Sequence, residues 1–303
     1  MILTPMSVRL FAPASSTGSH HPTLAAATLI AALVLLPAMD AIAKLLSAHL
    51  PRLEIVWARY LFCALAVVPV AFWKHGRTVL RPARPRLQCL RAALMATSAL
   101  MFFSAIARMP LADAIAVFFV YPFLILLASK LLLGEAIGWT RWTIIVVGFI
   151  GATLAAQPTF SGISPGVPFA LASGGAYAGA LLVTRRLAPR DPSLVTAALS
   201  ALLGLVAYSC ALPLAWTLPA ARDWPLMALM GVIAAIGHLL IVAAHRMTTA
   251  SQLAPYGYTE IVAAIFFGFV VFGDWPTPAV WTGIVVIVAS GVVARLTAPR
   301  AGQ

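Results

Sequence analysis

Ionisable residues inside long apolar stretches are the side chains of this sequence best placed to do chemistry. Asp40 and Lys44 lie four residues apart in one stretch, and His238 and Glu260 lie near the middle of two others. A charge at the centre of an apolar helix costs about 2.5–3.5 kcal/mol on insertion scales, so it is usually paired or functional. A buried acid can carry a proton or meet an amine, whereas a lysine can hold a carboxylate. These four residues are therefore candidates for binding a charged solute.

Each candidate also has a purely structural interpretation. An acid followed four residues later by a base lies on the same helix face, so Asp40 and Lys44 can form a neutralising ion pair. Alternatively, Lys44 faces a cavity and binds a carboxylate. Glu260 can be a neutral residue hydrogen-bonded to another helix, and His238 can be a hydrogen-bonded packing element. Arg59 lies between Trp57 and Tyr60 at the start of its segment and is interpreted as an interfacial anchor.

Aromatic residues gather around two prolines at comparable places in the chain. The two groups are Phe118 and Tyr121 beside Pro122, and Tyr256 and Tyr258 after Pro255. Ring faces can stack on an apolar solute, and tyrosine hydroxyls can orient its polar groups. A proline can break or kink its helix, and breaks in matching segments of two halves often mark a transport site. Core or lipid contact for the rings and a kink for packing alone are the alternatives.

The elements that position these residues are predicted to be membrane-spanning helices. The 303-residue chain is 62% hydrophobic and 9% charged, which excludes an ordinary soluble domain. Its apolar stretches run for about 20 residues and are continuous rather than alternating, which favours spanning helices over a barrel. The ten predicted helices cover residues 24–46, 54–73, 88–107, 111–132, 140–157, 166–186, 194–217, 225–245, 250–272 and 277–296.

Short motifs recur in the second half of the chain, which indicates an internal repeat. The motifs Arg108-Met109, Gly134-Glu135 and Trp142 recur as Arg246-Met247, Gly273-Asp274 and Trp281. Each copy holds five predicted helices, and an odd number of crossings turns the second copy upside down in the membrane. We therefore expect an all-α integral membrane protein built from two inverted five-helix repeats, residues 24–157 and 166–296.

The net charge of +12 does not indicate nucleic-acid binding, because the basic residues follow the predicted membrane topology. With the N-terminus inside, most Lys and Arg residues fall on the inner side, and only Arg52, Arg108 and Arg222 fall outside. This positive-inside bias predicts cytoplasmic N- and C-termini in a multi-pass protein of the cell inner (plasma) membrane. Residues 1–23 are expected to be a disordered cytoplasmic tail, and residues 297–303 a second cytoplasmic tail.

One segment carries a further set of motifs. Between Ala112 and Leu154 lie Tyr121-Pro122, Gly134-Glu135, Gly148 and Gly151. With Lys44 in the first helix, this pattern resembles the repeat unit of the drug/metabolite transporter superfamily, of the ten-helix EamA type. The resemblance covers about residues 24–296, and within the superfamily the chain looks most similar to the aromatic amino acid exporters.

The resemblance implies a central cavity, alternating access and export of small metabolites. The cavity would be lined mainly by the first, third, fourth, sixth, eighth and ninth helices. The second copy departs from the pattern, because Glu260 stands where Pro122 would repeat and Asp274 replaces the Glu of the first copy. These departures make the symmetry imperfect and leave the coupling ion open.

Together these features predict a secondary transporter that exports amino acids (aromatic or other neutral ones) or related small metabolites. Multidrug efflux or metabolite uptake by the same fold is an alternative, and a passive channel or scaffold is another. A membrane-embedded lipid enzyme would need a nucleophile with a base or clustered metal ligands, and the dispersed histidines supply neither. We predict no catalytic residue, metal site or cofactor. The expected partners are a small-molecule substrate and the lipid bilayer, with the protein a monomer or weak dimer.

Overall fold

The fold was examined in a computed structural model that describes residues 22–133, 143, 146–147, 149–151, 154, 164–187, 191–247 and 253–296. Every regular element in these ranges is a helix. The elements are α1 (Pro22–Leu46), α2 (Arg52–His75), η2 (Gly76–Leu80), α3 (Pro85–Ile106), α4 (Leu111–Phe118), α5 (Tyr121–Leu133), α7 (Val167–Leu187), α8 (Ser193–Ala211), η3 (Leu212–Leu214), α9 (Asp223–Met247), η4 (Ala254–Tyr258), α11 (Thr259–Phe272) and α12 (Pro278–Leu296).

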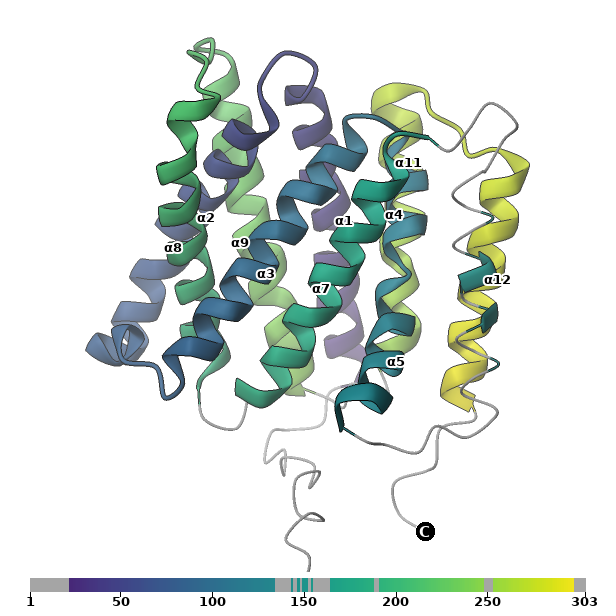
Figure 1. Ribbon diagram of the computed structural model, residues 1–303, viewed down its shortest axis with the longest axis horizontal. Coiled ribbons are helices and arrows are strands. Elements are labelled where there is room, and N and C mark those ends of the chain that lie inside the picture. The colour runs from purple at the N-terminus through teal and green to yellow at the C-terminus, as the bar shows by residue number, and fades with distance from the viewer. Residues whose placement is uncertain are drawn as a thin grey trace, which may run out of the picture.

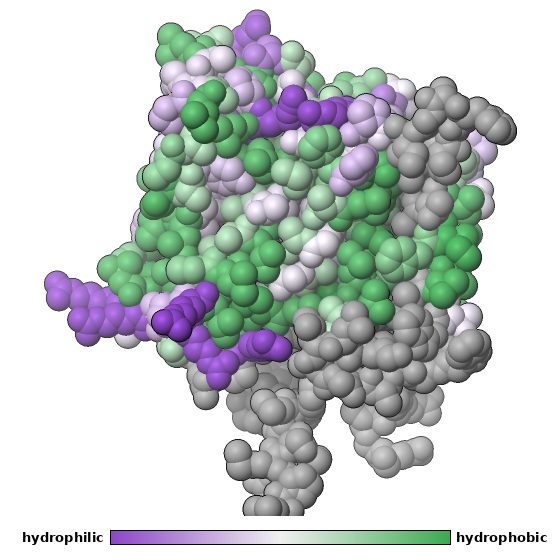
Figure 2. Space-filling model, viewed as in Figure 1, coloured by the Kyte–Doolittle hydropathy of each residue, from purple (hydrophilic) through white to green (hydrophobic). Residues whose placement is uncertain are grey.

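Six of the described helices are long and apolar enough to cross a membrane. These six correspond to α1, α2, α3, α7, α8 and α9. Three shorter apolar helices, Leu111–Ile125, Tyr256–Phe272 and Pro278–Ala289, accompany them, and most of the predicted segment 140–157 lies outside the described residues. Apolar side chains cover the middle of the molecule and hydrophilic ones gather towards its ends (Figure 2). This distribution is that of a protein surrounded by lipid.

The helices stand side by side along a common direction, and α1 lies behind α3 and α7 in this view (Figure 1). The largest contacts join α1 to α9, α3 to α7 and α2 to α8. Because lipid is as apolar as leucine, close packing between membrane helices depends on small residues rather than on hydrophobicity. A Cβ atom on Gly204 would lie 2.3 Å from the Tyr60 ring, and one on Gly231 would lie 2.4 Å from Phe62 Cβ. Glycine at these two places lets α8 and α9 pack directly against α2.

Both proline-containing segments are interrupted in the structure. The predicted helix 111–132 is divided into α4 and α5 by a turn at Phe119 and Val120. Pro122 is the second residue of α5. The predicted helix 250–272 begins with the 3₁₀ turn η4, which contains Pro255, before α11 starts at Thr259. Proline fits the first turn of a helix because its missing N–H has no partner there. Residues at both interruptions, Phe119 and Tyr258 among them, line the interior cavity described below.

Candidate functional site

The interior of the bundle contains a cavity of about 780 Å³. Its lining comes mainly from α1, α3, α4, α5, α7, α9, η4 and α11, which correspond to the six predicted helices that the superfamily resemblance implied. Most of the polar and aromatic side chains that reach it belong to Asp40, Arg59, Phe102, Phe118, Phe119, Tyr121, Tyr177, His238, Tyr258 and Glu260. A cavity of this size can enclose a metabolite-sized solute.

One side of the cavity is an aromatic wall formed by Phe102, Phe118, Tyr121 and Tyr177. The rings touch one another: Phe118 lies 5.3 Å from Phe102, 5.2 Å from Tyr121 and 5.3 Å from Tyr177 between ring centroids. The rings of Tyr121 and Tyr177 are 5.0 Å apart and perpendicular. Edge contacts of this kind stabilise an aromatic cluster beyond its buried area. The wall is therefore already assembled without a ligand, and it offers ring faces and two hydroxyl groups.

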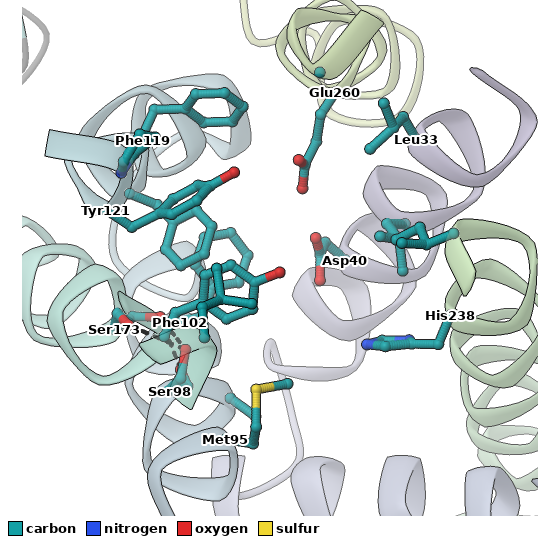
Figure 3. A pocket seen from close by; sticks show the side chains of 18 of the residues that line it. Leu33, Asp40, Met95, Ser98, Phe102, Phe119, Tyr121, Ser173, His238 and Glu260 are labelled. Carbon is teal, nitrogen blue, oxygen red and sulfur yellow. Dashed lines mark hydrogen bonds between the residues drawn. The ribbon is translucent and has the colours of Figure 1, made fainter. Parts of the chain in front are cut away.

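The position of Tyr177 depends on close packing between α7 and its neighbours. Gly174 lies so near the end of α4 that a Cβ atom there would be 2.9 Å from the Phe118 carbonyl oxygen. At the preceding position, Ser173 of α7 meets Ser98 of α3. Their hydroxyl oxygens are 3.0 Å apart, and each hydroxyl donates to the other residue's backbone carbonyl (Figure 3). Such hydrogen bonds join helices inside a membrane. Sequence reasoning missed Tyr177 because it selected aromatic residues beside Pro122 and Pro255, and Tyr177 lies far from both in the chain.

A second group of lining residues, here called the charged wall, consists of Asp40, Arg59, His238 and Glu260. Asp40, His238 and Glu260 lie opposite Phe102, Phe119 and Tyr121 in Figure 3. Asp40 projects from α1 and Glu260 from α11, and their carboxyl groups point towards each other across the cavity (Figure 3). Asp40 is only 6% exposed. Within the described part of the chain, neither carboxyl group makes an ion pair or hydrogen bond. The two acids predicted from sequence therefore meet in one place, and both face the space that a solute would occupy.

His238 has one ring nitrogen committed to its own helix. Its Nδ1 lies 2.7 Å from the carbonyl oxygen of Ala234, which can only accept, so Nδ1 donates this hydrogen bond. In a neutral imidazole the other nitrogen, Nε2, is then an acceptor. The bond to Ala234 matches the structural interpretation of His238, but the ring also extends into the cavity (Figure 3).

Arg59 was expected at the membrane interface, but it lines the cavity instead. Its guanidinium carbon lies 5.4 Å from the Tyr60 ring centre and 5.9 Å from that of Phe103, and its buried Nε has no hydrogen-bond partner among the described residues. The interfacial interpretation failed because α2 begins at Arg52, two residues before the predicted segment. Two full turns of helix therefore carry Arg59 into the bundle.

The predicted ion pair between Asp40 and Lys44 is wrong. Lys44 Nζ pairs with Asp274 Oδ2 at 2.7 Å and lies 4.4 Å from the Phe272 ring centre, and Lys44 does not line the cavity. The reason is the left-handed Gly273, with φ of 71°, which ends α11 and places Asp274 beside the end of α1. The long lysine side chain reaches this acid near the helix end, while Asp40 faces inward. Lys44 is therefore not positioned to bind a substrate carboxylate.

The second aromatic group divides between two surroundings. Tyr258 lines the cavity with its ring 6.3 Å from Phe119, whereas Tyr256 is 38% exposed and lies outside the lining. Successive residues of a 3₁₀ turn are separated by about 120°, so residues two apart face different directions. Tyr256 therefore faces away from the cavity that Tyr258 lines. Phe118, Tyr121 and Pro122 do line the cavity, as does Glu260.

Several structural findings together define the class of protein. The chain is a multi-pass membrane protein whose helices enclose an interior cavity with aromatic and charged walls. The model of the EamA-like transporter family matches it twice, at residues 23–157 and 164–295. This chain therefore belongs to the EamA-like transporter family, within the drug/metabolite transporter superfamily, and it is a transporter rather than an enzyme.

The curated relatives that this chain matches are named as transporters of chemically diverse solutes. An S-adenosylmethionine uptake transporter of Rickettsia felis is 25% identical over 83% of this chain and 85% of its own length. A riboflavin transporter of Rhizobium johnstonii is 26% identical over 80% of each chain. A pseudopaline exporter of Pseudomonas aeruginosa is 30% identical over 86% of this chain and 91% of its own. A crystal structure with 20% identity, covering 93% of this chain and 99% of the other, superimposes with a TM-score of 0.65, which establishes a shared fold.

Proposed function

We propose that this chain is a secondary transporter that exports amino acids, or solutes bearing an amino-acid group, across the inner membrane by alternating access. The observation that carries the proposal is the pairing of an aromatic wall with a charged wall in one cavity. A ring of the solute would lie against Phe118, Tyr121 and Tyr177. Its ammonium group would meet Asp40 or Glu260, and its carboxylate would meet Arg59. Arg59 thereby takes the role that the sequence suggested for Lys44.

The architecture that we propose for this transporter is ten helices in two inverted repeats, residues 24–157 and 166–296. The double match of the family model supports it. The packing supports it as well, because α1 and α3 of the first repeat correspond to α7 and α9 of the second. Exchanging the repeats converts the contact between α1 and α9 into the contact between α7 and α3, and both are among the largest in the bundle. The same exchange leaves the contact between α2 and α8 unchanged, as expected for a two-fold axis.

The membrane orientation completes the proposal. The concentration of Lys and Arg in loops on one side, including Lys74, Arg77, Arg81 and Arg84 between α2 and α3, favours a cytoplasmic location for that side. Both termini would then lie in the cytoplasm, and export would carry the solute away from them.

Uptake is the second candidate, and the names of relatives favour it. The Rickettsia relatives are S-adenosylmethionine uptake transporters, and this solute joins an amino-acid group to a flat purine. Riboflavin, carried by other relatives, is also a flat heteroaromatic molecule. Both solutes suit an aromatic wall, so they belong in the first set of substrates to be tested.

Counterflow in proteoliposomes tests the proposal. The purified protein is reconstituted, loaded with one unlabelled solute at a time, and presented with labelled phenylalanine, S-adenosylmethionine or riboflavin outside. We expect saturable accumulation of label that depends on the internal solute. Accumulation that rises linearly with concentration, without dependence on internal solute, would indicate a channel. No accumulation of any solute with amino-acid or heteroaromatic groups would contradict the proposed substrate class.

A further inference from the structure

The described lining of the cavity contains more acidic side chains than strongly basic ones. Among the lining residues that the structure describes, Asp40 and Glu260 are the acids and Arg59 is the strong base. Lys44 is paired with Asp274 outside the cavity, and Arg91 on α3 donates to Thr184 Oγ1 at 2.7 Å rather than entering the lining. In its charged form such a buried acid is unfavourable without a positively charged partner, so a cation that enters the cavity would be stabilised there.

The hydrogen-bonding groups of the charged wall point to the same kind of partner. Carboxylates accept hydrogen bonds, and His238 uses its Nδ1 proton on Ala234, which leaves Nε2 of a neutral ring to accept. Apart from Arg59, this wall therefore presents acceptors and negative charge. The aromatic wall opposite adds ring faces, which attract cations electrostatically.

An amino-acid group alone does not match this set of charges. Its carboxylate would neutralise Arg59 and its ammonium would neutralise one of the two acids, which leaves the other acid without a partner. A solute with one further positive charge would match both Asp40 and Glu260. The opposed carboxyl groups of these residues in Figure 3 leave the space between them for such a charge.

We propose that the substrate carries a second positive charge in addition to the ammonium of its amino-acid group, and that these two charges pair with Asp40 and Glu260. The inference rests on the proposed transport function and names its substrate class: a cationic amino-acid derivative with a flat ring. The ring lies against Phe118, Tyr121 and Tyr177. Neutral amino acids are then weaker substrates than cationic derivatives of the same size.

A pair of probes that differ in charge and little else tests this inference. S-adenosylmethionine has a sulfonium centre, and S-adenosylhomocysteine has a neutral thioether at the same place. Binding of both is measured to the purified protein in nanodiscs, and we expect the sulfonium compound to bind at least about tenfold more tightly. Glu260→Gln and Asp40→Asn should each reduce this preference, and the double variant should abolish it.

Glu54→Gln is the matched control. Glu54 is a buried acid of α2 that accepts from Thr217 Oγ1 at 2.8 Å and does not line the cavity. This control removes the same charge from the bundle and should leave the preference for the sulfonium compound unchanged. Glu260→Asp, which retains the charge, should keep most of the preference and guards against a loss of fold in Glu260→Gln.

The outcomes separate this inference from the transport function on which it rests. Equal binding of the two probes, or failure of both to bind, overturns the cationic substrate class. An equal loss of preference in Glu54→Gln and Glu260→Gln also overturns it. If neutral amino acids still show saturable counterflow in those cases, the transport function stands. If no solute shows counterflow, that function fails independently.

Discussion

The two walls of the cavity differ in how completely they are assembled without a ligand. The rings of Phe118, Tyr121 and Tyr177 contact one another at centroid distances of 5.0–5.3 Å, so the aromatic wall supports itself. Asp40 and Glu260 instead face each other without ion-pair or hydrogen-bond partners among the described residues. The aromatic side is therefore held in place by its own contacts, while on the other side a positively charged ion or solute would balance the charge of the acids.

Acids outside the cavity provide a useful contrast. Asp274 pairs with Lys44, Asp223 lies 3.1 Å from His49 Nε2, and Glu54 accepts from Thr217. All three join different helices or loops, as expected of structural contacts. Each of these three acids has a partner, whereas Asp40 and Glu260 have none among the described residues, which is why we assign those two to the substrate rather than to the fold.

Removing both acids of the charged wall should have the largest effect. The double variant Asp40→Asn/Glu260→Gln should lower initial transport by at least about a hundredfold, because two charged contacts to the solute are lost. Initial rates of labelled substrate counterflow measure this, with size-exclusion profiles to monitor folding. Near-normal transport by a well-folded preparation of the double variant would show that the charged wall does not bind substrate.

Adding a methyl group at Gly174 should have the next largest effect, because it acts on the aromatic wall through the backbone. Gly174→Ala should destabilise the protein by about 1–3 kcal/mol, since its Cβ would meet the Phe118 carbonyl oxygen at 2.9 Å. Gly175→Ala is the control on the same helix, because a Cβ there meets nothing within 4 Å. Thermal unfolding in detergent compares the two, and equal melting temperatures would argue against tight α4–α7 packing.

Truncation of a single ring should have a moderate effect. Tyr177→Ala should weaken substrate binding about tenfold, in keeping with stacking contributions of about 1–3 kcal/mol per ring. Tyr177→Phe should retain most binding, because the ring contacts with Phe118 and Tyr121 remain. Tyr256→Ala, on an exposed tyrosine outside the cavity, should change little. If Tyr256→Ala weakens binding as much as Tyr177→Ala, the aromatic wall is wrongly placed.

Loss of the pair between Lys44 and Asp274 should have the smallest effect. Both side chains are partly exposed, at 16% and 31%, and such pairs contribute about 0–1 kcal/mol. Lys44→Ala should therefore lower substrate affinity less than about twofold. Arg59→Ala should lower it far more for a carboxylate-bearing solute, and the reverse order in a competition assay would restore Lys44 as the carboxylate-binding residue.

Much of the fold could be predicted from the sequence, because length and hydropathy are local properties. A run of about 20 apolar residues must satisfy its backbone hydrogen bonds internally, which makes it a helix wherever it packs. Asp40, His238 and Glu260 could likewise be identified as unusual, since the cost of a charge in an apolar helix does not depend on the neighbouring helix. The prolines at positions 122 and 255 marked the two interruptions for the same local reason.

The faces of the helices, by contrast, were decided by tertiary packing. A membrane helix is apolar on all sides, so its sequence has no strong polar stripe to show which face turns inward. Only the assembled bundle turned Asp40 into the cavity and Lys44 towards Asp274, and only its packing brought Arg59 and Tyr177 beside the substrate space. Which charges meet depends on contacts between residues far apart in the chain, and a pattern within one helix does not contain that information.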